Sequence, residues 1–181
     1  MHVKDMVFIS LSTAIMAVLG FLPPVVLPFT PVPITMQTIG VMLSGGINKP
    51  KNAGLSLIVF LLLVASGMPI LAGGRGGIGV FTSPSAGFLL AYPAAAFFIA
   101  LAVGRLSVLH FRHLFLIHLL FGILFIYAVG VPVQAFLMNI SLQKALTFCL
   151  VYVPGDLLKS AIAAYLVLKL RKAMQIKRQG I

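Results

Sequence analysis

Long apolar runs restrict what this chain can fold into more than any other feature. A helix needs about 20 residues to cross the hydrocarbon core of a bilayer, and five runs come close to that length or reach it. A sixth run, 34–47, is shorter. It spans the bilayer core only if the apolar, proline-rich residues before it also lie within the core. The longer runs are residues 6–22, 53–71, 86–103, 114–131 and 145–170. We therefore expect an all-α integral membrane protein with six transmembrane helices in a single membrane domain, residues 1–181.

The composition agrees, because 61% of the residues are hydrophobic and only 8% are charged, too few to cover the surface of a soluble protein. In a soluble chain a net charge of +11 would suggest a nucleic acid partner, but in a membrane protein the basic residues first report topology. Excess Lys and Arg mark the cytoplasmic face, so we expect both termini in the cytoplasm and no nucleic acid partner. When successive loops are assigned to alternate sides, ten of the thirteen basic residues fall on one side: Lys4, Lys49, Lys51, Arg105, Arg112, Lys169, Arg171, Lys172, Lys177 and Arg178.

Two charged residues, Asp156 and Lys159, lie inside the last apolar run. The chain has only two acidic residues, and the other, Asp5, lies near the N-terminus. An ionised side chain in the bilayer core costs about 2.5–3.5 kcal/mol on insertion scales, so such residues usually face a cavity and mark function. Residues three positions apart share a helix face, so this carboxylate and this ammonium can point at one spot.

The residues before Asp156 predict a break in the last helix. Pro154 and Gly155 precede it directly, so we expect the helix to kink or begin afresh there, which frees backbone groups that must be satisfied within the protein. Broken helices of this kind commonly line transporter sites. A second interpretation stays open, in which Asp156 caps a new helix start while Lys159 extends to the outer surface.

Two loops on the expected outer side have unusual compositions. Residues 21–33 hold five of the eleven prolines, so this loop is stiff and extended, either as a plain connector or as a lid over a site. Residues 72–79 place five glycines around Arg75. Glycine lets successive N–H groups converge on an anion, so this loop predicts a local anion site, with a flexible outer turn as the alternative. The candidate ligand-binding residues here are Gly73, Gly74, Arg75, Gly76 and Gly77.

Other residues limit the chemistry. His110, His113 and His118 have no carboxylate partner and Cys149 is the single cysteine, so we predict no metal and no redox cofactor. The chain also lacks a Walker-type glycine loop, so it does not use ATP by itself in the usual way. An intramembrane enzyme with Asp156 as base and Arg75 as anion clamp would lack a second carboxylate and a nucleophile. For Gln37 and Tyr92 the default role is an ordinary helix–helix hydrogen bond, and only Gln37 rises above that default, because it lies next to the proline-rich loop. Both are candidate ligand contacts.

Three motifs together resemble the BioY family, the biotin-specific S components of energy-coupling factor (ECF) transporters. The motifs are Pro31-Val-Pro-Ile-Thr-Met-Gln-Thr38, Ala72-Gly-Gly-Arg-Gly-Gly-Ile-Gly79 and Pro154-Gly-Asp-Leu-Leu-Lys159. The resemblance implies a six-helix S-component fold that binds biotin on the outer side of the bacterial cytoplasmic membrane. It also implies that the first and third loops close over the ligand, that Asp156 and Lys159 bind it, and that Arg75 occupies the glycine-loop position.

The resemblance further implies partners: a transmembrane T component and two ABC-type ATPases, in contact with membrane lipid. The chain itself would be a binding subunit and not an enzyme, and it would be a homo-oligomer if it acts alone. In the family, small residues four apart on the first helix contact the T component. Here Ser10 and Ala14, or Thr13 and Ala17, have that spacing.

Biotin's chemistry suits these residues. Its ureido ring offers two N–H donors and one carbonyl acceptor, so we assign Asp156 to the N–H groups and Lys159 to the carbonyl. The valerate carboxylate would then meet Arg75 and glycine N–H groups, although the reverse pairing, with Lys159 on the carboxylate, stays open. An S component for another vitamin is the alternative function, since the fold alone does not assign a ligand.

Overall fold

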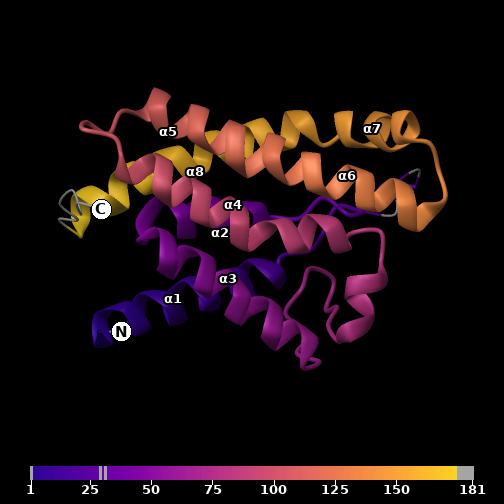
Figure 1. The fold of residues 1–181 in the computed structure, drawn as a ribbon, viewed down its shortest axis with the longest axis horizontal. Helices are drawn as coiled ribbons and strands as arrows, with labels where there is room; N and C mark the ends of the chain where they lie inside the picture. Colours follow the sequence, from indigo (N-terminus) through magenta and orange to yellow (C-terminus); the bar gives the residue numbers. More distant parts are fainter. Residues whose placement is uncertain (1, 29, 31, 175–181) are drawn as a thin grey trace.

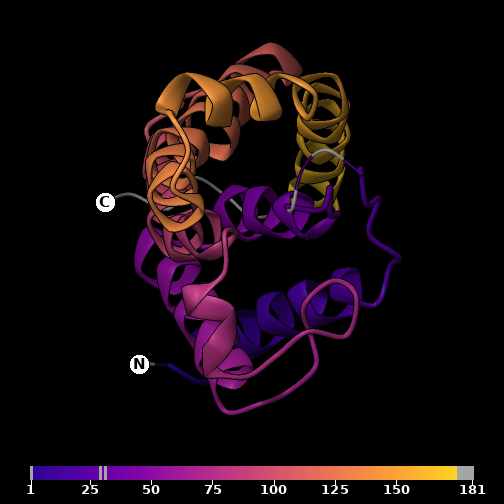
Figure 2. The same ribbon diagram turned by 90° about the vertical axis from the view of Figure 1, so that its right-hand side faces the viewer.

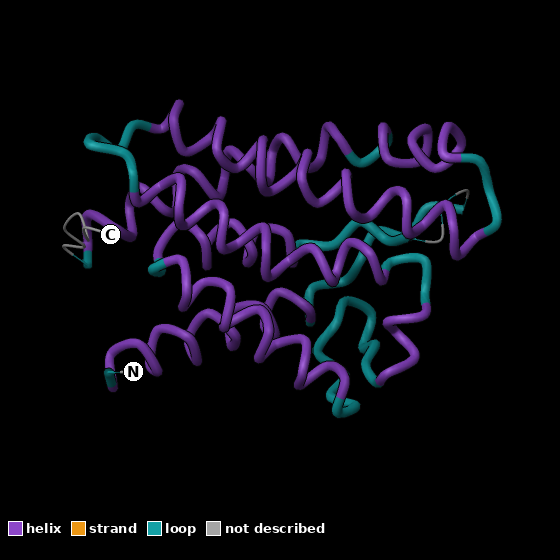
Figure 3. Tube along the Cα trace, viewed as in Figure 1, coloured by secondary structure: helices purple, strands orange, loops and turns teal. Residues whose placement is uncertain are grey.

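The structure is a computed structural model that describes residues 2–28, 30 and 32–174. These residues form α-helices, a 3₁₀-helix (η1), a π-helical segment (η2) and loops (Figures 1 and 3). Extended pairing within them is limited to two isolated bridges, Val25 with Ile34 and Leu71 with Arg75. The predicted all-α architecture is therefore observed. The helices are α1 (Val3–Gly20), α2 (Gln37–Ile47), α3 (Pro50–Ala65), η1 (Ile78–Thr82), α4 (Ala86–Gly104), α5 (Phe111–Ile117), η2 (His118–Leu124), α6 (Phe125–Met138), α7 (Leu142–Leu150) and α8 (Val153–Ala173).

Three helical segments of the described chain are long and apolar enough to cross a membrane. They are α1, α4 and the continuous run Phe111–Met138 that joins α5, η2 and α6. The pair α7 and α8, bent by 55° between Leu142–Leu150 and Val153–Ala173, counts as a fourth if it forms one broken span. The helices α2 and α3 have 11 and 16 residues, below the length that a straight span needs. The number of six spans thus stays a prediction.

The helices run roughly along the long axis of the molecule, and the two ends of the bundle differ. The chain begins at α1 and α8 ends at the same end of the bundle (Figure 1). The loop segments 21–28, 32–36 and 66–85 and the turn from α6 to α7 gather at the opposite end, which faces the viewer in Figure 2. We call these the terminal end and the loop end.

The helix α2 lies at the centre of the bundle, where it packs against α1, α3, α4 and α8. Small residues allow helices to approach one another closely, and α2 ends in the pair Gly45 and Gly46. A Cβ atom on Gly45 would lie 2.6 Å from Cβ of Ile99 and 2.8 Å from the backbone oxygen of Ala96, both on α4. On Gly46 it would lie 2.3 Å from Cγ2 of Val167 on α8. These glycines set the spacing between α2 and its neighbours.

We predict that Gly45→Ala destabilises the protein by about 1–3 kcal/mol, because the added methyl group meets a Cβ and a backbone atom of α4 that cannot move alone. The matched control is Gly54→Ala in α3, where the nearest atom to an added Cβ is 3.6 Å away. Thermal unfolding of the purified protein in detergent should show a lower midpoint for the first variant only. Equal midpoints for the two variants would contradict the close α2–α4 contact.

Candidate functional site

The break between α7 and α8 fixes the position of Asp156. The sequence predicted a break at Pro154 and Gly155, whereas the structure ends α7 at Leu150 and begins α8 at Val153, so Pro154 falls in the first turn of α8. Proline is well suited there because its missing N–H would have no helical partner. Asp156 also lies in this first turn, where the helix dipole stabilises a carboxylate.

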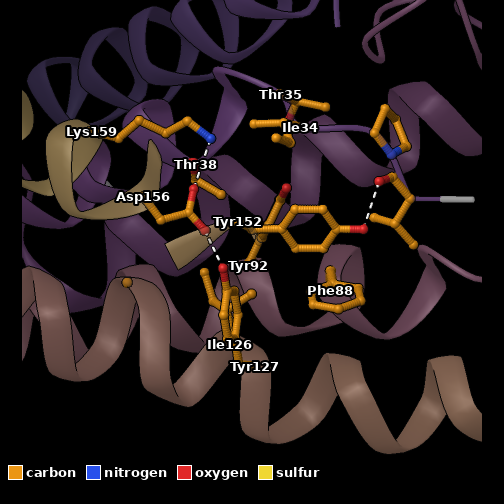
Figure 4. A pocket seen from close by; sticks show the side chains of 13 residues that line it. Ile34, Thr35, Thr38, Phe88, Tyr92, Ile126, Tyr127, Tyr152, Asp156 and Lys159 are labelled. Atoms are coloured by element: carbon orange, nitrogen blue, oxygen red, sulfur yellow. Dashed lines mark hydrogen bonds and ion pairs between the residues drawn. The ribbon is translucent and has the colours of Figure 1, made fainter. Parts of the chain in front are cut away.

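Asp156 and Lys159 form a buried ion pair, with Lys159 Nζ 2.8 Å from Asp156 Oδ1 (Figure 4). The residues are only 6% and 5% exposed. The second carboxylate oxygen, Oδ2, accepts a hydrogen bond of 2.5 Å from the hydroxyl of Tyr127 on α6. A buried pair of this kind is weak evidence for stability, because the cost of desolvation can exceed the attraction between the charges. The surrounding groups instead hold the carboxylate in one orientation.

The pair lies in the wall of a cavity that is bounded by the loop 32–35, α2, α4, η2, α6, the break between α7 and α8, and α8 itself. The cavity encloses about 460 Å³ of space between atoms, a figure that includes its open mouth. Most of the lining is apolar or aromatic, with the charged pair on one side. The lining residues are Val32, Pro33, Ile34, Thr35, Thr38, Phe88, Tyr92, Gly122, Ile126, Tyr127, Tyr152, Asp156 and Lys159.

Three of the four tyrosines of the chain line this cavity: Tyr92, Tyr127 and Tyr152. Their aromatic rings offer flat apolar surfaces, and their hydroxyls need hydrogen-bond partners when buried. Tyr127 packs edge-on against Phe88, with ring centroids 6.2 Å apart. Sequence reasoning named Tyr92 but missed Tyr127 and Tyr152. The available signal was the occurrence of tyrosine in otherwise apolar runs.

The proline-rich loop forms one wall of the cavity. Val25 and Ile34 pair through two backbone hydrogen bonds of 3.0 and 2.9 Å, which bring the two halves of the loop together. The hydroxyl of Tyr152 donates to the backbone oxygen of Val32 at 2.9 Å and is also hydrogen-bonded to Thr30. The loop is therefore tied to the break between α7 and α8, the same break that positions Asp156.

One polar group in the cavity wall is left without a hydrogen-bond partner in the described part of the chain. The hydroxyl of Thr38, in the first turns of α2, is buried and makes no hydrogen bond to the described residues. Buried polar atoms in native structures are nearly always hydrogen-bonded. An unsatisfied hydroxyl in the wall of a cavity therefore favours a polar ligand.

The structure does not bring the glycine loop to this cavity wall. Arg75 is half-buried, and its guanidinium donates to the backbone oxygen of Ala72 at 3.3 Å and to Oγ of Ser85 at 3.5 Å. The loop closes on itself, because the N–H of Leu71 donates to the oxygen of Arg75. The remaining predicted residues of the loop, Gly73, Gly74, Gly76 and Gly77, are also absent from the lining, and three of them have positive φ angles, 79°, 69° and 87° for Gly73, Gly74 and Gly77.

Gln37, the other predicted contact from the first loop region, also does not line the cavity. Its side chain is 2% exposed, and its Nε2 donates to the backbone oxygens of Met16 and Ile70 at 3.3 and 3.2 Å. Its Oε1 accepts from the N–H of Ala72 at 3.5 Å. Gln37 therefore braces the end of α1 and the start of the glycine loop against α2. Of the nine predicted ligand residues, Tyr92, Asp156 and Lys159 line the cavity.

The four residues predicted to dock a partner lie on two faces of α1. Ser10 and Ala14 are exposed. Thr13 is buried, and its hydroxyl is hydrogen-bonded to the backbone oxygens of Ile9 and Ser56, the latter on α3, while Ala17 is only partly buried against the core. Only the pair Ser10 and Ala14 presents an exposed surface of small residues.

Comparison with known proteins identifies relatives along nearly the whole chain. The model of the BioY family matches residues 1–176. The probable biotin transporter BioY of Bacillus subtilis (strain 168) is 58% identical over 172 residues, which cover 95% of this chain and 92% of the relative. The biotin transporter BioY of Rhizobium etli is 37% identical over 172 residues, which cover 92% of each chain.

A solved structure shares the fold. The crystal structure of the S-component for biotin from an ECF-type ABC transporter matches with a TM-score of 0.90 and 36% sequence identity, over 94% of this chain and 92% of that one. The S-component fold predicted from the three motifs is thereby confirmed. Because the family model and the relatives cover almost its entire length, this chain belongs to the BioY family.

Proposed function

We propose that this protein is the substrate-binding subunit for biotin uptake across the bacterial cytoplasmic membrane. The observation that carries the proposal is the buried pair of Asp156 and Lys159 in the wall of a cavity lined by three tyrosines. Relatives named as biotin transporters and the solved S-component for biotin support the same ligand. The protein binds and translocates its ligand and catalyses no reaction.

The charge of the pair favours the ureido end of biotin at this place. The carboxylate of Asp156 and the ammonium of Lys159 together carry no net charge, and the ureido ring is also neutral. Its N–H groups suit Asp156 and its carbonyl suits Lys159. The rings then lie between aromatic and aliphatic side chains, including Tyr92, Phe88 and Ile126. The valerate carboxylate extends toward the loop end, where Arg75 and the glycine N–H groups bind it once the loop closes.

The distribution of basic residues supports an outward-facing cavity. Eight lysines and arginines of the described chain lie in elements at the terminal end of the bundle, whereas the cavity is bounded by a loop of the opposite end. Since excess positive charge marks the cytoplasmic face, the termini lie inside and the cavity captures biotin from outside. The eight residues are Lys4, Lys49, Lys51, Arg105, Arg112, Lys169, Arg171 and Lys172.

Release of the ligand requires partner subunits. The solved relative is described as the S-component of an ECF-type ABC transporter, so we propose a transmembrane T component and two ATPase subunits as partners here. The exposed pair of Ser10 and Ala14 on α1 supplies a surface of small residues on which a partner helix can pack closely. ATP hydrolysis in the partners then drives inward release.

The ligand itself is tested by mass spectrometry. Protein purified gently from its membrane, then denatured, should release biotin in an amount close to one molecule per chain when biotin is added before purification. Recovery of a different vitamin would show that the cavity binds that vitamin, and the assignment of biotin would be wrong. Recovery of no ligand despite added biotin would overturn the proposed function.

We predict that Asp156→Asn and Lys159→Ala each weaken biotin binding by about tenfold or more, equivalent to 1.4 kcal/mol, because each change removes a charge-assisted hydrogen bond to the ureido ring. Lys144→Ala is the matched control, since Lys144 is an exposed residue of α7 that does not line the cavity. Titration calorimetry measures the affinities, with thermal unfolding to show that each variant is folded. If both site variants bind biotin with the affinity of the wild-type protein, Asp156 and Lys159 do not contact the ligand.

We further predict that Tyr127→Phe weakens biotin binding by about threefold to tenfold, because one ordinary hydrogen bond contributes about 0.5–1.5 kcal/mol. The change leaves the ring in place but releases Oδ2 of Asp156. Tyr165→Phe serves as control, because Tyr165 is 53% exposed on α8. If both variants bind biotin equally well, Tyr127 does not orient the carboxylate.

A further inference from the structure

A second cleft lies at the terminal end of the bundle, away from the cavity that holds Asp156. It is formed where the first turns of α1 meet the turn from α2 to α3. Its empty space is about 610 Å³, with the open mouth included. The lining residues are His2, Lys4, Asp5, Phe8, Ile47, Asn48, Lys49 and Asn52.

One residue of the cleft lining, Asn48, carries a buried acceptor without a hydrogen-bond partner among the described residues. Asn48 is 5% exposed, and its amide nitrogen donates to Oγ of Ser12 at 2.7 Å and to Oγ of Ser44 at 3.3 Å. Its Oδ1 is buried and has no hydrogen-bond partner among the described residues. A buried amide oxygen left without a donor is costly, so a donor from a ligand would stabilise it.

The neighbouring hydroxyls fix which way this amide points. Ser56 donates to the backbone oxygen of Ala53 at 2.8 Å, so its oxygen accepts the proton of Ser44, 2.8 Å away. Ser44 has then used its only proton and can only accept from Asn48. The amide nitrogen of Asn48 therefore faces the serines, and its oxygen remains available as an acceptor.

The carboxylate of Asp5 adds a second acceptor to the cleft. Its Oδ1 accepts from the amide of Asn52 at 2.8 Å and its Oδ2 from the backbone N–H of His2 at 3.2 Å. Among the residues that the structure describes, the salt bridge of the chain is Lys159 with Asp156, so Asp5 is not neutralised by direct contact with a lysine or arginine. A carboxylate has lone pairs beyond these two bonds and can accept from a cation.

Cations and apolar side chains surround these acceptors. Lys4 and Lys49 are exposed residues of the lining. Lys4, Phe8 and Leu11 follow one another at positions i, i+4 and i+7 on α1, so they share one helix face. Leu11 is 52% exposed. The cleft thus combines internal acceptors, lysines in its lining and an apolar stripe that leads from it along α1 toward the membrane core.

We propose that this cleft binds the headgroup of a phospholipid that carries a primary ammonium group, as phosphatidylethanolamine does. The phosphate meets Lys4 and Lys49, the ammonium donates to Oδ1 of Asn48 and to Asp5, and an acyl chain follows Phe8 and Leu11. A purely anionic headgroup fits less well, because the acceptors of Asn48 and Asp5 repel it. A trimethylated headgroup also fits less well, because it has no N–H to donate. This site is independent of the proposed transport function.

Native mass spectrometry of the full chain in detergent tests the site with lipids of identical acyl chains. We expect phosphatidylethanolamine to be retained about tenfold more than phosphatidylcholine, the difference expected of hydrogen bonds to charged groups, and more than phosphatidylglycerol. Asp5→Asn should abolish the preference for phosphatidylethanolamine over phosphatidylcholine. Lys49→Gln should lower the retention of both phosphatidylethanolamine and phosphatidylcholine. Lys51→Gln is the control, since this exposed lysine lies outside the lining.

Equal retention of phosphatidylethanolamine and phosphatidylcholine by the wild-type protein would overturn the proposal without any variant, because the cleft would then not select a primary ammonium group. Preferential retention of phosphatidylglycerol would overturn it as well, because it would show a simple anion site. An unchanged ethanolamine preference in Asp5→Asn would contradict the assigned acceptor. Thermal unfolding of each variant shows that the lipid comparison is made on folded protein.

Discussion

Burying the carboxylate of Asp156 and the ammonium of Lys159 in an apolar bundle is favourable only when further hydrogen bonds satisfy both groups. Among the described residues, the structure supplies such a bond to the carboxylate of Asp156. The break before Val153 places Asp156 in a first helical turn, Tyr127 reaches Oδ2 from α6, and Tyr152 ties the proline-rich loop to the same break. Tyr127 thus contacts the pair directly, whereas Tyr152 anchors the helix break from which Asp156 projects.

The same arrangement explains how one bundle serves a ligand with two different ends. The cavity around the pair has no net charge and offers flat aromatic walls, which suits a neutral fused ring. The cationic glycine loop at the loop end suits a carboxylate, but in this structure it binds its own backbone and Ser85. Capture of biotin would then require the loop to exchange internal hydrogen bonds for bonds to the ligand. We therefore expect the cavity around the charged pair to be formed before the ligand binds, and the glycine loop to change its conformation on binding.

Local spacing was enough to predict that Asp156 and Lys159 point at one spot, and the structure pairs them, while their contact with a ligand stays a prediction. The positions of Asp156 and Lys159, three residues apart and just after Pro154, required no knowledge of tertiary contacts. Sequence reasoning failed where distant segments meet: Tyr127 and Tyr152 reach the cavity only because α6 and the α7–α8 break approach each other. Gln37 was predicted as a ligand contact, but the backbone oxygens that surround it occupy its amide. The helical architecture followed from the apolar runs, whereas the central position of α2 depends on glycines whose neighbours the sequence does not name.

The most direct test of the account is a high-resolution structure of this protein with biotin bound. We expect the ureido ring to lie within hydrogen-bond distance of Asp156 and Lys159, between Tyr92 and the proline-rich loop, with the valerate chain directed toward Arg75. A carboxylate bound at Lys159 with the ureido ring near Arg75 would reverse the assigned orientation. Density for biotin outside this cavity would contradict the central claim.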